Sequence, residues 1–224
     1  MLLVKENNAQ TIEGTSGLFF IPSAEIQRDG QLTLGASFVD KELISFSGYK
    51  KDAFTPYLSV AYLPFAEFAI KITRIINYEG NRQGIGDRTF SARIRFLEEG
   101  EFIPAVLIGM HDIMTVFGGT EAIRNNAFYF AATKNYKINS GILNNILINA
   151  GYGTDWFEAQ NHNFVGLFGG VSFRLWNHIE LMTEYDGKYT NGGIRLKLFD
   201  HFSLLAGVLR LKNFSGSASV NFSL

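Results

Sequence analysis

The chain contains no cysteine, only four prolines and no clear excess of either charge among its 224 residues. Without cysteine, disulfides, thiolate nucleophiles and cysteine-ligated metals are excluded. Twenty Lys and Arg against 21 Asp and Glu leave a net charge of −1. Because nucleic-acid binding depends on a basic surplus, we expect no nucleic-acid partner.

Long apolar runs are also missing. The richest stretch, residues 57–72, is interrupted by Ser59, Pro64, Glu67 and Lys71. It therefore falls short of the roughly 18 apolar residues that a transmembrane helix needs. The opening residues 1–10 are too short and too soon polar to form a complete signal peptide, so we expect an export signal to have been removed.

Alternation of apolar and polar residues with a period of two is abundant. In residues 214–223, apolar or small residues alternate with four serines and one asparagine, and residues 88–97 show the same pattern with two arginines. This alternation predicts strands with two unlike faces. Twelve segments show it, near 31–39, 55–63, 66–75, 88–97, 104–112, 126–135, 145–154, 164–174, 178–186, 190–198, 201–210 and 214–223.

The lengths of these segments point to a membrane barrel. Most span 9–11 residues, as tilted membrane-spanning strands do, whereas strands of soluble sandwiches are commonly about 5–6 residues long. The sequence therefore predicts an all-β fold, a transmembrane antiparallel β-barrel of about twelve strands over residues 31–224. A soluble lipocalin-like barrel is the alternative, but it requires eight strands.

The connections support this prediction because long and tight ones alternate, as in outer-membrane barrels. The long connections lie near 40–54, 76–87, 113–125 and 155–163, and the tight ones at 64–65, 98–100, 175–177 and 199–200. Aromatic residues or histidines stand at three tight turns, at Phe65, Trp176 and Phe199. They predict an aromatic girdle at the periplasmic interface, and ordinary hydrophobic contacts within the turns are the alternative.

The polar face of the strands carries charges of both signs. A ring of twelve strands is too wide for apolar side chains alone to fill, so we expect the apolar face to contact lipid and the polar face to line the lumen. Buried there, the charges must pair with one another or with water, as structural ion pairs without a catalytic role. The predicted lumen-lining residues are Lys71, Arg93, Arg95, Glu180, Glu184, Arg195 and Lys197.

Residues 1–30 precede the first predicted strand and form a separate N-terminal segment. Two placements are open, a plug inside the lumen or a periplasmic tail. Four glycines predicted to face the lumen on adjacent strands could leave space for a plug: Gly151, Gly153, Gly166 and Gly170.

No pattern of catalytic or metal-ligating residues stands out. The histidines at 111, 162, 178 and 201 lie on separate segments without metal-ligand spacing, and the glycine pairs do not form a phosphate-binding loop. A hydrolytic site would need a serine and a histidine facing the same way on neighbouring strands. His111 meets Ser91 or Thr89 only if the register allows, and the strand directions argue against it. We expect no enzymatic activity, metal or cofactor.

One run has a more specific order of residues. Residues 87–109, which read DRTFSARIRFLEEGEFIPAVLIG, resemble the YjbH family of bacterial outer-membrane proteins linked to exopolysaccharide production. The resemblance is best over residues 14–153. Its motif positions are Asp87, Arg88, Phe90, Leu97, Glu98, Glu99, Gly100 and Pro104, and we expect residues 97–100 to form a tight hairpin in which Gly100 has a positive φ.

The resemblance implies a barrel in the bacterial outer membrane that takes part in export or surface assembly of an extracellular polysaccharide. Two further functions remain open, an accessory barrel within a larger outer-membrane complex and a small-solute diffusion channel. The expected partners are outer-membrane lipid and other outer-membrane or polysaccharide-export proteins.

Overall fold

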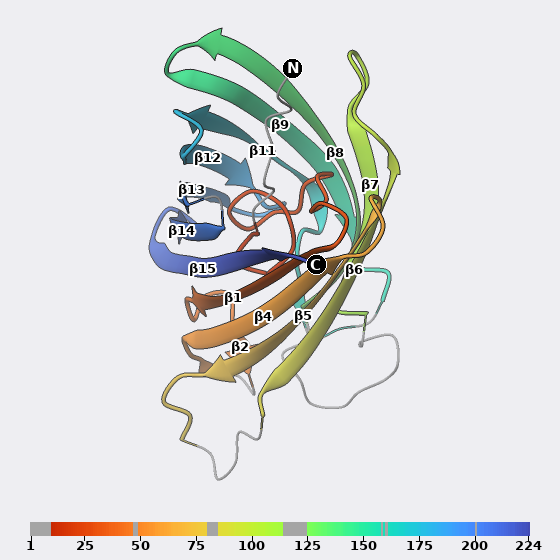
Figure 1. Ribbon diagram of the computed structural model, residues 1–224. Coiled ribbons are helices and arrows are strands. Elements are labelled where there is room, and N and C mark those ends of the chain that lie inside the picture. The colour runs from red at the N-terminus through yellow and green to blue at the C-terminus, as the bar shows by residue number, and fades with distance from the viewer. Residues whose placement is uncertain are drawn as a thin grey trace.

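The computed structural model describes residues 10–46, 49–79, 85–113, 125–157, 159, 161–199 and 201–224. Its strands curve around a central space in which residues from 10 onward lie before the first strand begins (Figure 1). The barrel strands are β1 (Gln31–Val39), β4 (Ala53–Ala61), β5 (Ala66–Ile75), β6 (Asp87–Leu97), β7 (Ala105–His111), β8 (Asn125–Ser140), β9 (Leu143–Thr154), β11 (Gly166–Leu175), β12 (Ile179–Tyr185), β13 (Thr190–Leu198), β14 (Phe202–Leu209) and β15 (Asn213–Ser223).

These strands form a closed ring. Along the chain each barrel strand pairs antiparallel with the next, and β1 pairs with β15 to close the circle, starting at Gln31 opposite Ser223. The short strands β2 (Ser45–Phe46) and β3 (Tyr49–Lys50) form a separate hairpin, and β10 (Asn161–His162) pairs in parallel with β8. The predicted antiparallel barrel of twelve strands is confirmed, and three predicted segments, 31–39, 66–75 and 190–198, coincide with strands.

Two connections differ from the prediction. β8 and β9 are longer than expected and leave only residues 141–142 between them, where Gly141 adopts a φ of 61°. Residues 97–100 do not form the expected tight hairpin, because seven residues, 98–104, separate β6 from β7. Gly100 has no positive φ, and its N–H donates to the Ile103 carbonyl at 3.1 Å instead.

The two ends of the barrel are unlike. One end, called the tight-turn end here, holds the connections 62–65, 98–104, 141–142, 176–178 and 199–201 together with the start of β1 and the end of β15. The opposite end, called the loop end, holds the longer connections 40–52, 76–86, 112–124 and 155–165 and the short ones 186–189 and 210–212. Large aromatics are exposed at the tight-turn end, including Phe102 at 87% and Phe199 at 90%.

The two faces of the sheet follow the alternation in the sequence. Outward-facing apolar side chains are exposed on strands all around the ring, for example Leu34, Ile94, Ile148 and Phe214. Inward-facing side chains are mostly polar and buried, for example Ser59. No helix in the described ranges is long and apolar enough to cross a membrane.

Glycines let large aromatic rings lie across the inner wall. Gly35 pairs with Tyr57, Gly109 with Tyr129 and Gly151 with Phe168 on neighbouring strands, and in each pair the ring occupies the space beside the glycine. Gly151 therefore makes room for a wall side chain rather than for the N-terminal segment. Such pairs stabilise a sheet where a glycine alone would weaken it.

Candidate functional site

The lumen is occupied by residues 10–27, called the plug from here on. Its side chains Ile12, Phe19 and Ile21 have no exposed surface, and Leu18 is 1% exposed. Two isolated bridges, between Gln10 and Ser16 and between Gly17 and Pro22, fold the plug into compact loops. Of the two placements open for the N-terminal segment, the structure thus places these residues inside the barrel.

A wall carboxylate binds consecutive backbone amides of the plug. Glu184 of β12 accepts the N–H groups of Phe19 at 3.1 Å, Phe20 at 2.9 Å and Ile21 at 3.3 Å. The Asn191 amide donates to the same carboxylate at 3.2 Å. Three consecutive backbone amides and one side-chain amide thus share one carboxylate, which fixes the plug backbone at Phe19, Phe20 and Ile21.

A wall arginine binds the carbonyl groups of the same part of the plug. Arg195 of β13 donates from one terminal nitrogen to the carbonyl oxygens of Gln10 at 3.2 Å, Gly17 at 2.9 Å and Leu18 at 2.7 Å. Its other terminal nitrogen pairs with Glu180 at 2.7 Å. The neighbouring strands β12 and β13 therefore bind both kinds of backbone group in the plug, Glu184 its N–H groups and Arg195 its carbonyl groups.

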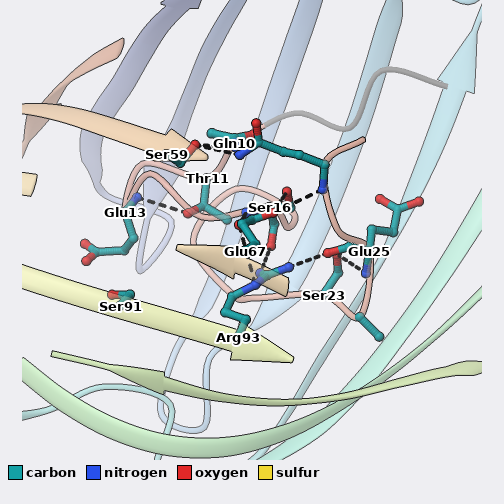
Figure 2. Close-up of polar contacts among 12 residues, drawn as sticks. Gln10, Thr11, Glu13, Ser16, Ser23, Glu25, Ser59, Glu67, Ser91 and Arg93 are labelled. Atoms are coloured by element: carbon teal, nitrogen blue, oxygen red, sulfur yellow. Dashed lines mark hydrogen bonds and ion pairs between the residues drawn. The ribbon is translucent and has the colours of Figure 1, made fainter. Parts of the chain in front are cut away.

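A second ion pair anchors the plug from the opposite side of the ring (Figure 2). Glu67 of β5 accepts the Ser16 N–H at 2.8 Å, the Ser16 hydroxyl at 2.6 Å and the Gln27 N–H at 3.2 Å. Arg93 of β6 lies 3.5 Å from the same carboxylate and donates to the carbonyls of Ser16 and Glu25. Both charged side chains are fully buried.

A third cluster joins a plug carboxylate to the wall. Glu13 pairs with Lys71 of β5 and lies 3.0 Å from Nε2 of His111. Burial by itself raises the pKa of Glu13, but the positive charge of Lys71 and the contact with His111 outweigh it and hold the pKa well below its usual range. Glu13 is therefore ionised at neutral pH and ties the plug to β5 and β7.

The register does bring Ser91 and His111 together, contrary to the sequence-based expectation. Ser91 Oγ lies 3.1 Å from His111 Nδ1, because β6 and β7 are antiparallel neighbours and both side chains face inward. His111 contacts Ser91 through Nδ1 and the plug residue Glu13 through Nε2, and the Glu13 carboxylate also pairs with Lys71. Ser91 and His111 are each 3% exposed, so both side chains are buried inside the barrel.

The apolar part of the plug packs against small wall residues. A Cβ on Gly193 or Gly207 would lie within 3.1 Å of the Phe19 ring or its Cβ, and one on Gly170 would lie 2.8 Å from Leu18. Of the four glycines predicted to leave space for the plug, Gly170 contacts it. Gly193 and Gly207 lie on β13 and β14, where the alternation alone gave no sign of the ring they accommodate.

The seven predicted lumen residues fall into two groups. Five are buried against the plug or its contacts: Lys71, Arg93, Glu180, Glu184 and Arg195. Arg95 and Lys197 are half-buried nearer the tight-turn end, where Arg95 donates to the Pro64 carbonyl at 2.9 Å and pairs with Glu98 at 3.2 Å.

Several residues that join the plug to the wall were not named as site residues, among them Glu67, Glu13 and Ser16. Glu67 shares a strand face with Lys71 and could have been found by extending the alternation. The other two lie in a segment without periodicity.

The family-motif positions lie along β6 and the connection that follows it. Asp87 and Arg88 begin β6 at the loop end. Glu98 is largely exposed, whereas Glu99 accepts the Asn135 N–H at 2.8 Å and pairs with Lys134 at 3.1 Å. Within the described ranges, no three His, Asp or Glu residues are arranged to hold a metal ion.

Comparison with known proteins identifies the family. The model of the YjbH family, described as exopolysaccharide biosynthesis protein YbjH, matches residues 10–197, from the first residue of the plug into β13. The uncharacterized lipoprotein YjbH of Escherichia coli (strain K12) is 26% identical over 80% of this chain and 28% of its own length. The chain thus spans little more than a quarter of that relative.

Among solved structures, a KdgM porin aligns with 87% of this chain and 99% of its own, with a TM-score of 0.49 and 9% identity. The family match covers most of the chain, including the plug and the strands that hold it. The chain therefore belongs to the YjbH family.

Proposed function

We propose that this chain is a bacterial outer-membrane β-barrel that acts, with its lumen plugged, in export or surface assembly of an extracellular polysaccharide. The polysaccharide part is supported by the family description. The buried plug is the observation on which the proposal of a plugged lumen depends, because it occupies the inside of the barrel.

The surface of the barrel supports a place in the membrane. An outward apolar face on a closed ring, with polar side chains inside, is the arrangement that lipid requires of spanning strands. The exposed aromatics at the tight-turn end, among them Trp176 and Phe199, suit a membrane–water interface. Short turns face the periplasm in outer-membrane barrels, which orients the loop end toward the cell exterior.

The plug in the lumen favours a barrel that is closed to solutes over a small-solute diffusion channel. Plug side chains and their hydrogen bonds occupy the space that a solute would need, and the anchoring pairs Glu67–Arg93 and Glu180–Arg195 are buried. This favours an accessory barrel within a larger export or assembly complex as the second candidate function, ahead of a small-solute channel. Its partners would be outer-membrane lipid and other outer-membrane or polysaccharide-export proteins.

We propose no hydrolytic role. Ser91 and His111 form a hydrogen bond beneath the plug, where it stabilises the contact of His111 with Glu13. A nucleophile needs access to its substrate, and both side chains are buried while the plug is docked.

The proposal is tested by deleting the gene and measuring polysaccharide in the medium, at the cell surface and in the periplasm, with complementation by the wild-type gene. Loss outside with accumulation inside supports a role in export. Loss of surface attachment with normal release into the medium supports a role in assembly. Unchanged amounts in every fraction contradict both.

A planar-bilayer measurement separates the closed barrel from the channel. We expect the purified wild-type barrel to show no steady conductance and a variant lacking residues 1–29 to conduct. Steady ion flow through the wild type would instead support the diffusion channel.

A further inference from the structure

Basic side chains interrupt the apolar outer face of the barrel near each of its two ends. On the twelve barrel strands, the alternation leaves three basic side chains and no acidic ones facing outward: Arg74, Arg88 and Lys134. Lys134 lies near the tight-turn end, where it pairs with Glu99 at 3.1 Å and donates to the Gly100 carbonyl. Arg74 and Arg88 lie together at the other end.

The register shows that the two arginines are neighbours. Arg88 of β6 lies opposite Ile72 of β5, so Arg74 is its diagonal neighbour on the same face. Diagonal positions across a strand pair are about 7–8 Å apart, within reach of long side chains that share one ligand. Gly86 lies beneath the stem of Arg74, since a Cβ there would come within 3.0 Å of Arg74 Cγ.

Neither guanidinium makes a hydrogen bond or ion pair with the residues that the structure describes, and both side chains are exposed. Their surroundings are apolar: Phe54, the cross-strand partner of Arg74, is 49% exposed, and Ile70 is 41% exposed. A charge on the lipid-facing surface of a barrel is costly near the membrane midplane and tolerated near the interface. Arg74 is the penultimate residue of β5 and Arg88 the second of β6, which puts both at headgroup depth.

We propose that Arg74 and Arg88 form a binding site for the phosphate groups of a bisphosphorylated glycolipid of the outer leaflet, a lipid of the lipid A type. This inference rests on the proposed function, because the membrane and its orientation place the pair in that leaflet. Guanidinium groups bind phosphate through two parallel hydrogen bonds, and two arginines match a headgroup that carries two phosphates. The acyl chains lie along the apolar side chains toward the middle of the strands, including Phe54 and Ile70.

The site is tested on the purified, folded barrel in detergent. Native mass spectrometry measures the retention of bisphosphorylated lipid A, of its dephosphorylated form, and of lipid A in the presence of excess inorganic phosphate. The test variant is R74Q/R88Q. The matched control is K188Q/K212Q, which removes two exposed positive charges from the connections 186–189 and 210–212, at the same end of the barrel but next to other strands than β5 and β6.

We expect the test variant to retain lipid A at least tenfold more weakly than the wild type and the control variant to match the wild type. The dephosphorylated lipid should bind the wild type as weakly as lipid A binds the test variant. Equal lipid A binding by test variant and wild type overturns the inference. Displacement of the lipid by millimolar phosphate also overturns it, because it shows a site for free anions.

Failure of the membrane assignment is distinguishable from failure of the site. If the wild type does not insert into lipid vesicles, as judged by protection of its strands from protease, the proposed function fails. If both proteins insert and only the lipid comparison is negative, the barrel assignment stands and the arginine site alone is rejected.

Discussion

Glu67 holds Ser16 by both oxygens of its carboxylate, one accepting the Ser16 N–H at 2.8 Å and the other its hydroxyl at 2.6 Å. The two residues are 51 positions apart, and one belongs to the wall and the other to the plug. Arg93 binds the Ser16 carbonyl from the other side of the same ion pair. This contact makes docking of the plug depend on wall charges that are themselves buried.

Replacing Glu67 should therefore loosen the plug. We expect Glu67→Gln to cost about 3–5 kcal/mol of plug docking, because it leaves Arg93 buried without its counter-charge. The chain has no cysteine, so Thr15→Cys, at a residue 5% exposed, supplies a single reporter for maleimide labelling. Labelling should be slow with wild-type Glu67 and fast in the variant. The exposed Glu98→Gln serves as the control and should leave the rate unchanged.

Glu184 should control the plug backbone locally. In Glu184→Gln one acceptor oxygen replaces two, so the amides of Phe19, Phe20 and Ile21 lose one of the two oxygens that they share. Hydrogen exchange of these three amides should accelerate by at least tenfold while exchange in the strand amides stays unchanged. Unaltered protection of all three would show that the carboxylate is dispensable for plug order.

Acid should weaken the contact made by Glu13. Its pKa lies below the ordinary glutamate value of 4.5 in the folded state, so its contribution to docking is fully present above that value and is lost as the pH falls through the lower folded pKa. The Thr15→Cys reporter, reacted with an acid-tolerant disulfide reagent, should become accessible at low pH. In Glu13→Gln that part of the pH dependence should disappear, and an unchanged profile in this variant would falsify the assignment.

A larger side chain at position 193 should weaken docking of the plug, because it would press against the Phe19 ring. A Cβ at residue 193 would lie 3.0 Å from the Phe19 ring, so Gly193→Val should cost about 1–3 kcal/mol of plug docking through overpacking. Removing the ring with Phe19→Ala should relieve the overpacking, so the double variant should recover part of the docking free energy that Gly193→Val loses. Gly192→Ala is the matched control, because its Cβ would meet only the Met182 carbonyl at 3.8 Å. Purely additive effects of the two changes would argue that the residues do not pack together in solution.

The sequence predicts those features that depend on residues close together in the chain. Alternation is local, because successive side chains of a strand point to opposite faces, and so it identified twelve strands and their polar sides. It therefore placed Arg93, Glu180 and Arg195 on inward faces. The same rule assigns Arg74 and Arg88 to the outer face, although their proximity needs the register between β5 and β6.

The sequence by itself determined the fold class, the strands and the charge on their inner faces, because each depends on residues close together in the chain. Only the tertiary structure decided that the plug lies inside, that Glu13 meets Lys71 and His111, and that Ser91 reaches His111. Plug residues 10–27 have no periodicity, and their contacts with Glu67, Glu184 and Arg195 join positions from 40 to 185 residues apart. Such contacts follow from closure of the ring, which only the folded chain reveals.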